Sequence, residues 1–192
     1  MNTERREHVP SGGFTLIETL VAVSLLTVAI VAPMSLVAQS LSAAIYARDQ
    51  VTAYSLAQEG IEGVRAIRDG NILINALQGQ NLGLLDGIPT GNQAFTIDAT
   101  QSTASAAIQV CASNPCPPLT TDGTLYGYGS GWSATGFTRT MSAAFVGSSA
   151  ISGGQDAIRV SATVSWRTPG GQTRSFTIYE NMYSWIASGA AQ

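Results

Sequence analysis

The chain has 192 residues, a formal net charge of −3 and only 11% charged side chains. Lysine is absent and the one histidine, His8, lies near the N-terminus, so the abundant serines lack the bases that usually activate a nucleophile. These features argue against an enzyme and, because phosphate binding needs clustered cations, against a broad nucleic-acid surface.

Residues 14–38 form an apolar run that is long enough to cross a bilayer at about 1.5 Å of rise per helical residue. Its one charged residue is Glu18, near the start. A carboxylate is costly in hydrocarbon and is retained where a partner charge meets it. The small residues Ser11, Gly12 and Gly13 precede the run, whereas a secretory signal places its cleavage site after it. Processing before Phe14 would therefore leave the apolar helix on the mature chain.

Gly13, the aromatic Phe14, the TLIE stretch ending at Glu18 and the apolar run resemble the N-terminus of type IV prepilins, including the pseudopilins of type II secretion. The resemblance implies cleavage after Gly13 by a prepilin peptidase and N-methylation of Phe14. It also implies assembly with other pilin or pseudopilin subunits by machinery in the inner membrane. The subunit would be a single-pass cytoplasmic membrane protein before assembly and part of an extracellular or periplasmic filament afterwards.

Glu18 has a physical role that agrees with this resemblance. Once Phe14 begins the chain, its amine is a cation in an apolar bundle, and Glu18 of a neighbouring subunit can neutralise it where screening is poor. The alternative is a plain signal anchor with an incidental acid. Further along, Pro33 lacks the donor that would bond to Ala29, which predicts a kink or a locally loosened helix.

The helix is expected to continue over residues 39–70, where no proline interrupts it until a stop at Asp69-Gly70-Asn71. Gly60 and Gly63 lower helix propensity but permit close backbone approach. Arg65 is spaced to pair with Glu62 and with Asp69 on a solvated face. One stripe at three- and four-residue steps is predicted to pack on a sheet. Its members are Val51, Tyr54, Ala57, Ile61, Val64 and Arg68.

Beyond a turn-rich connection, the hydrophobic period changes to two. Residues 157–167 alternate as a half-buried strand, 168–172 form a turn, and 174–183 return as a second strand. Further strands are expected at 94–99, 106–111, 125–128 and 137–146. The predicted fold is α+β, a long N-terminal helix packed on an antiparallel β-sheet, as in pilins. The predicted division is a leader at 1–13, a membrane or filament-core helix at 14–38, its amphipathic continuation at 39–70 and a β-rich domain at 71–192.

Cys111 and Cys116 are the only cysteines. Outside the membrane, a pair this close most simply forms a disulfide, and free thiols are the alternative if the compartment is not oxidising. No metal or cofactor is expected, because two thiolates need two further ligands. Residues 117–136 are interpreted as an exposed binding loop or as a solvated connection with Trp132 folded onto the sheet. A glycosidase pair of acids stays open, since no pairing is visible among Asp86, Asp98, Asp122, Asp156 and Glu180.

These features predict a structural filament subunit, either a minor pilin or a pseudopilin. The alternative is a binding module, an adhesin or a DNA-uptake pilin, displayed on such a filament. A small positive balance in the C-terminal third is far below what a nucleic-acid surface normally shows, so no nucleic-acid partner is expected. That balance sets Arg139, Arg159, Arg167 and Arg174 against Asp156 and Glu180.

Overall fold

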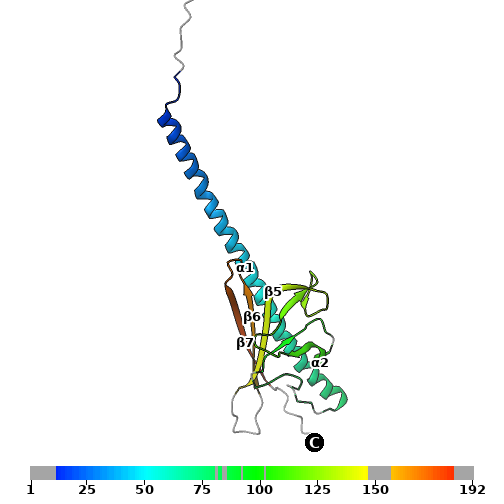
Figure 1. Ribbon diagram of the computed structural model, residues 1–192. Helices are drawn as coiled ribbons and strands as arrows, with labels where there is room; N and C mark the ends of the chain where they lie inside the picture. The colour runs from blue at the N-terminus through cyan, green and yellow to red at the C-terminus, as the bar shows by residue number, and fades with distance from the viewer. Residues whose placement is uncertain are drawn as a thin grey trace, which may run out of the picture. The chain divides into compact units, whose positions relative to one another are not determined.

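The computed structural model describes residues 12–80, 82–83, 86–91, 93–101, 103–146 and 157–183. These residues form the long helix α1 (Leu16–Gln78), the short helix α2 (Ala104–Ala107) and seven strands of one antiparallel sheet. Figure 1 labels both helices and the strands β5, β6 and β7. The chain divides between Ile45 and Tyr46 into two compact units, and the sheet belongs to the second. The predicted α+β class is confirmed.

The sheet is organised around β5 (Ser133–Phe145), its longest strand. One edge of β5 pairs with β6 (Ala157–Arg167), which pairs in turn with β7 (Thr173–Tyr183). The other edge pairs with β1 (Phe95–Ile97) and β3 (Pro118–Thr121), because Met141 opposes both Ala162 and Phe95. These two short strands lead to β2 (Ile108–Val110) and β4 (Tyr126–Gly127).

The predicted hairpin of β6 and β7 is confirmed. β6 has the predicted bounds and β7 starts one residue before the predicted Arg174. The turn between them is closed by the Thr168 N–H, which donates to the Gln172 carbonyl at 2.8 Å. Gly171 has a φ of 78°, a conformation that residues with a Cβ rarely adopt. Strict alternation and a glycine turn are local signals, which is why this hairpin could be predicted from sequence.

Residues 117–136 are neither an exposed loop nor a solvated connection as a whole, although the strand predicted within them at 125–128 is present as β4. This segment contains β3 and β4 and the start of β5, which begins at Ser133 instead of at residue 137. Leu119 of β3 is completely buried in the core, and the Thr135 hydroxyl donates to the Leu119 carbonyl at 2.6 Å. Trp132 is half-buried over Gly129, where an added Cβ would lie 2.5 Å from the indole. β3 and β4 have no alternating hydrophobic pattern, because pairing with a neighbouring strand is what makes them strands.

Three further strand predictions need smaller corrections. The strand expected from residue 106 starts at Ile108, because the residues before it form α2. β1 and β4 lie within their predicted ranges but are shorter. The boundary errors therefore lie where a strand has only a few paired residues.

Helix α1 does not end at Gly70 as predicted but continues to Gln78. The side chain of Asn71 donates to the Asp86 carbonyl at 2.9 Å, so the following chain is bonded to the helix face. Asn75 likewise donates to the Leu82 carbonyl at 2.7 Å and accepts from its N–H at 2.8 Å. These contacts give the last two turns partners that a helix ending at Gly70 would lack.

The actual end of α1 is set by Gly79. Its φ is 61°, and its N–H donates to the Asn75 carbonyl at 3.1 Å. This is the left-handed glycine cap that closes many helices. The sequence signal of Asp69-Gly70-Asn71 was therefore a stop signal that tertiary contacts override.

The face of α1 that packs on the sheet is rotated from the predicted stripe. Ala57, Ile61 and Val64 are buried as predicted, but Val51 is 69% exposed and Tyr54 46% exposed. The buried face is richer in small residues than the predicted one, which lets the helix approach the sheet closely. Its members are Ala53, Leu56, Ala57, Gly60, Ile61, Val64, Ile67 and Asn71.

Gly60 and Gly63 have the close-approach role that their positions suggest. A Cβ on Gly60 would lie 2.8 Å from the sulfur of Met141 in β5. A Cβ on Gly63 would lie 2.8 Å from Cγ2 of Ile97 in β1. The backbone of α1 therefore rests directly on buried side chains of two strands.

Candidate assembly site

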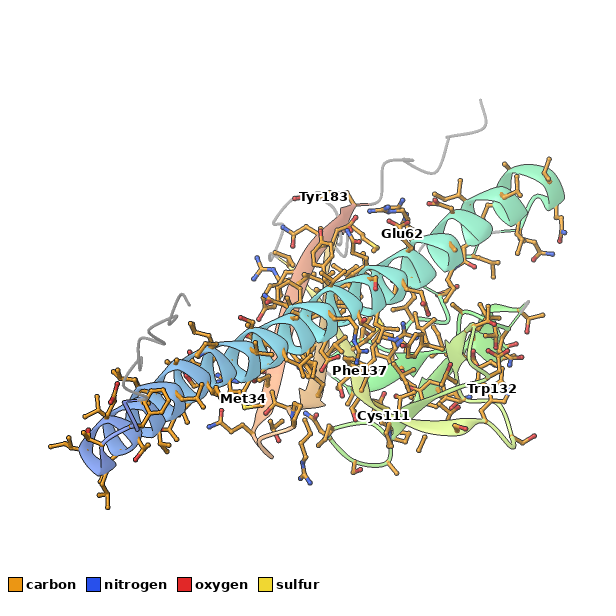
Figure 2. All side chains as sticks on the ribbon, turned by 90° about the horizontal axis from the view of Figure 1, so that it is seen from above. Met34, Glu62, Cys111, Trp132, Phe137 and Tyr183 are labelled. Carbon is orange, nitrogen blue, oxygen red and sulfur yellow. A yellow bond between two sulfur atoms is a disulfide. The ribbon has the colours of Figure 1, made fainter. Side chains whose placement is uncertain are left out.

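The first part of α1 exposes its apolar side chains. From Phe14 to Leu41 the exposed large apolar side chains range from 48% to 83% exposure. In Figure 2 side chains such as Met34 project from this part of the helix. Among the described residues, α1 is the one helix long and apolar enough, by length and composition, to cross a membrane. An apolar surface of this extent is a candidate membrane anchor and needs a covering of lipid or protein.

The hydroxyl groups of this apolar segment are satisfied by its own backbone. The side chains of Thr19, Ser24, Thr27 and Ser35 each donate to the carbonyl three residues earlier, at 2.8 Å. Such bonds let a hydroxyl sit in an apolar environment without losing its hydrogen bond. The Thr15 hydroxyl accepts from the Glu18 N–H, so Glu18 is the one polar side chain of residues 14–38 that makes no hydrogen bond within the segment.

Glu18 lies in the first turn of α1. Its N–H donates to the Thr15 hydroxyl at 3.3 Å, so Thr15 acts as the N-cap in a Thr-x-x-Glu arrangement. Its carboxylate forms no ion pair with any described residue. A negative charge in a first turn also interacts favourably with the helix dipole. Glu18 therefore has a local role in starting α1, besides the predicted pairing with a neighbouring subunit.

The remaining predicted residues of this segment are placed as follows. Gly13 and Phe14 precede the helix, and Phe14 is 83% exposed. An added Cβ on Gly13 would meet no atom within 4 Å. Pro33 lies inside α1, which is helical on both sides of it, and its predicted kink or loosening stays a prediction. Most of the predicted leader lies outside the described residues.

The second unit contains a buried cation, Arg139, which the predicted surface balance of the C-terminal third includes. Arg139 of β5 is completely buried. One terminal nitrogen donates to the Leu56 carbonyl at 2.9 Å and to Oε1 of Glu59 at 3.0 Å, and the other donates to the Ile97 carbonyl. Arg139 thereby joins α1, β1 and β5 at one point.

A sequence signal for this burial was present. Phe137, Arg139, Met141 and Ala143 occupy alternate positions of β5, so the arginine falls in the apolar phase of the strand. With Arg139 buried, the positive balance expected at the surface of the C-terminal third is smaller than predicted. Asp156, which entered that balance, lies outside the described residues.

A second ion-pair network connects α1 with β7. Arg65 pairs with Glu62, as predicted, and also with Glu180 of β7. The hydrogen bond to Glu180 raises the pKa of Arg65 above its ordinary value. The predicted pairing of Arg65 with Asp69 is wrong, because Asp69 pairs with Arg68 at 2.8 Å. Glu180 lies on β7, and only the tertiary fold brings it to Arg65 on α1.

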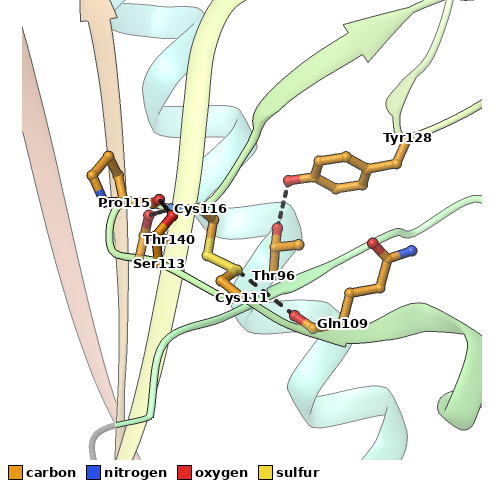
Figure 3. Close-up of a disulfide and its surroundings, with 8 residues drawn as sticks. All are labelled: Thr96, Gln109, Cys111, Ser113, Pro115, Cys116, Tyr128 and Thr140. Atoms are coloured by element: carbon orange, nitrogen blue, oxygen red, sulfur yellow. Dashed lines mark hydrogen bonds between the residues drawn. A yellow bond between two sulfur atoms is a disulfide. The ribbon is translucent and has the colours of Figure 1, made fainter.

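Cys111 and Cys116 form the predicted disulfide, with their Cα atoms 5.3 Å apart. Figure 3 shows how the bonded loop lies against the sheet: the Cys116 N–H donates to the Thr140 hydroxyl of β5 at 3.1 Å. Cys116 is only 3% exposed, whereas Cys111 is half-buried. The disulfide thus closes a small loop that is anchored at one end.

The described acids of the C-terminal part have structural roles. Asp98 accepts from the hydroxyl and N–H of Thr100 at 2.6 and 3.0 Å, and Asp122 accepts from two N–H groups at 2.8 Å. Asp86 accepts from the Gly83 N–H at 2.8 Å. These bonds account for their positions without a catalytic pair. Within the described ranges, no three His, Cys, Asp or Glu side chains gather as they would around a metal ion.

Asp98 is the most buried of these acids, at 2% exposure. Burial alone would raise the pKa of its carboxyl, but the hydrogen bonds from Thr100 and Gln101 outweigh burial and lower the pKa below its ordinary value of 3.8. Asp98 is therefore held as a carboxylate that closes the turn after β1.

One comparison with known proteins identifies the N-terminal segment. The family model of the Prokaryotic N-terminal methylation motif matches residues 10–32. The matched range includes Gly13, Phe14 and Glu18, so these residues lie within a type IV pilin-like class III signal. No curated protein and no solved structure matches the chain.

Proposed function

We propose that this type IV pilin-like chain is a minor pilin or pseudopilin, cleaved after Gly13, N-methylated at Phe14 and assembled through its apolar helix. The N-terminal methylation motif supports the pilin-like class of subunit. The finer assignment rests on the first part of α1. Its partners are a prepilin peptidase, other pilin or pseudopilin subunits and an assembly machinery in the inner membrane.

The observation that carries this proposal is the isolated carboxylate of Glu18 on an exposed apolar helix. Four of the five hydroxyls in the segment donate to its own backbone and the fifth, Thr15, accepts from the Glu18 N–H. None of the exposed apolar side chains has a partner within the first unit that covers it. A bundle of such helices would cover the apolar surface. The amine of Phe14, created by cleavage, would supply the cation that Glu18 lacks.

Cleavage is the step that this proposal makes most directly testable. Co-expression with a prepilin peptidase should yield a mature chain that begins at Phe14, with one added methyl group in its intact mass. Gly13→Leu should remain unprocessed in the membrane, because a side chain at this position would hinder entry of the backbone into the peptidase. Gly12→Leu, one residue earlier, is the matched control and should be cleaved normally.

N-terminal sequencing and intact mass together decide the outcome. A mature chain that begins at any residue other than Phe14 would contradict the proposal. Equal processing of Gly13→Leu and the wild type would contradict it as well.

A further inference from the structure

The face of the sheet that points away from α1 is a regular polar surface. Along β6, the even-numbered residues are buried in the core that includes α1, and the odd-numbered residues face outward. The outward positions form rows across the strands, because β5, β6 and β7 are paired in register. Three such rows are Thr138, Ser165 and Ser175; Thr140, Thr163 and Thr177; and Ser142, Ser161 and Tyr179.

The next row along contains an exposed arginine. Ala144, Arg159 and Asn181 are paired across β5, β6 and β7. Arg159, Asn181 and Tyr179 line a depression of about 320 Å³. Tyr179 is 68% exposed and lies diagonal to Arg159 on the neighbouring strand. An exposed aromatic ring, a guanidinium and an amide therefore converge on one hollow.

The guanidinium of Arg159 is available to a ligand. Its Nε donates to Oδ1 of Asn181 at 3.2 Å, which orients the group, and it pairs with no carboxylate among the described residues. None of the described outward positions on β5, β6 or β7 carries an acid. A planar guanidinium of this kind recognises a carboxylate or sulfate through two parallel hydrogen bonds.

We propose that the hollow at Arg159, Tyr179 and Asn181 binds an acidic sugar residue of a polysaccharide. The flat C–H face of a sugar ring packs on Tyr179, its acid group pairs with Arg159, and its hydroxyls bond to Asn181 and to the neighbouring Ser161 and Thr177. Aromatic side chains supply large contact area with a polar end, which suits a ligand with both apolar faces and hydroxyls. This inference does not depend on cleavage or filament assembly.

The composition of the face favours a glycan over a protein partner or a nucleic acid. Protein interfaces bury apolar side chains at their centre, and the outward rows are mostly hydroxyls. The two outward arginines, Arg159 and Arg167, are eight residues apart on one strand, which is about 26 Å at about 3.3 Å per residue. This separation is too wide for the clustered cations on which nucleic-acid binding depends.

The test uses the full chain in detergent micelles and two trisaccharides of the same linkage, trigalacturonate and neutral galactotriose. Ligand-observed NMR titrations give the dissociation constants. The wild type should bind the acidic sugar about tenfold more tightly than the neutral one, as expected for one charge-assisted contact. Arg159→Gln should remove this difference and leave binding of the neutral sugar unchanged. Tyr179→Ala should weaken binding of both sugars about tenfold.

Arg167→Gln is the matched control, because it removes the same charge from the same strand and face outside the hollow. It should bind both sugars as the wild type does, and Tyr179→Phe should retain binding because the ring is kept. Equal affinity of the wild type for the two sugars would overturn the proposal. So would an equal loss in Arg167→Gln and Arg159→Gln, or tighter binding of a single-stranded DNA 12-mer than of trigalacturonate.

Discussion

Arg139 is the residue on which three elements of the second unit converge. Its guanidinium is completely buried and bonds to the carbonyls of Leu56 and Ile97, which lie 83 and 42 residues away along the chain. Glu59, with 35% of its side chain exposed, provides the counter-charge at 3.0 Å. A buried charge is tolerated only with such partners, so these bonds specify how α1 sits on β1 and β5.

Replacing Arg139 by methionine tests this role. Arg139→Met keeps much of the side-chain volume but leaves buried carbonyls without their donor, which should lower the free energy of unfolding by about 2 kcal/mol. Arg174→Met, on the exposed start of β7, should change it by less than about 0.5 kcal/mol. Denaturant titrations of the full chain in micelles measure both values. Equal stability of the two variants would show that Arg139 is dispensable for the fold.

Asp98 should make stability depend on pH. The pKa of its carboxyl is lowered in the folded chain, so the unfolded chain takes up a proton near pH 3.8 while the folded chain does not. Its stabilising contribution is therefore complete above pH 3.8 and is lost as the pH falls through the lower, folded pKa. Asp98→Asn should be less stable than the wild type at pH 7, and this difference should shrink towards pH 2.

The control for this pH dependence is Asp69→Asn on the solvent-facing side of α1, where the carboxylate side chain is 54% exposed. Unfolding free energies at several pH values between 7 and 2 give the comparison. Parallel curves for the wild type and Asp98→Asn would rule out a stabilising role for the charged form of Asp98.

At the scale of elements, the contact between α1 and the sheet depends on helix residues without side chains. Gly60 and Gly63 lower the helix propensity of α1. In return, side-chain atoms of Met141 and Ile97 come within 2.8 Å of where a Cβ on Gly60 and Gly63, respectively, would lie. Gly70 is also inside α1, but an added Cβ there would meet no atom within 4 Å. Substitution at Gly70 therefore reports only the cost of glycine in a helix. Substitution at Gly60 or Gly63 also disturbs packing against the sheet.

Gly63→Ala and Gly70→Ala should change stability in opposite directions. At Gly70 the substitution should raise the free energy of unfolding by about 0.5–1 kcal/mol, because alanine is the better helix former. At Gly63 the same gain is opposed by overlap with the branched and buried Ile97, and the net effect should be a loss of about 1 kcal/mol. Thermal unfolding of both variants in micelles measures the signs. Stabilisation by both substitutions would contradict the packing role of Gly63.

At the scale of the whole molecule, the two units satisfy their side chains in different ways. The second unit buries a core of its own, whereas the first exposes its apolar side chains and leaves the Glu18 carboxylate without an ion-pair partner among the described residues. Glu18 has two candidate roles, as part of the helix N-terminus and as the partner of a neighbouring amine. A substitution that removes the charge but keeps the hydrogen-bonding shape can separate them.

If Glu18 pairs with a neighbouring Phe14 amine, Glu18→Gln and Glu18→Val should both be inserted and cleaved but should both be missing from filaments. Glutamine suits the same position of a capping box, so only the charge is lost in the first variant. Thr19→Val is the control, since it removes a hydroxyl that bonds only to its own helix. The measurement compares each variant in sheared filaments with its membrane pool. Normal incorporation of Glu18→Gln would assign Glu18 to helix capping alone.

Much of the fold follows from local patterns. The alternation of residues 157–167 and the glycine turn after it predict β6 and β7 almost to the residue, because a paired hairpin needs only neighbouring segments. The close pair Cys111 and Cys116 predicts the disulfide for the same reason. β3 was missed because it is only four residues long, starts with a proline and is defined by its pairing with β5.

The N-terminal segment could be interpreted from the sequence alone because its motif is one continuous stretch of the chain. Gly13, Phe14, Glu18 and most of the apolar run lie within residues 10–32, the range that the methylation motif matches. Only the tertiary structure decided that Arg139 is buried, that α1 continues past Gly70 and that Arg65 pairs with Glu180. Arg139 and Arg65 meet partners 42 to 115 residues away, and the last turns of α1 meet residues 7 to 15 positions further along the chain. A local pattern does not show which of these carbonyls or carboxylates a side chain will meet.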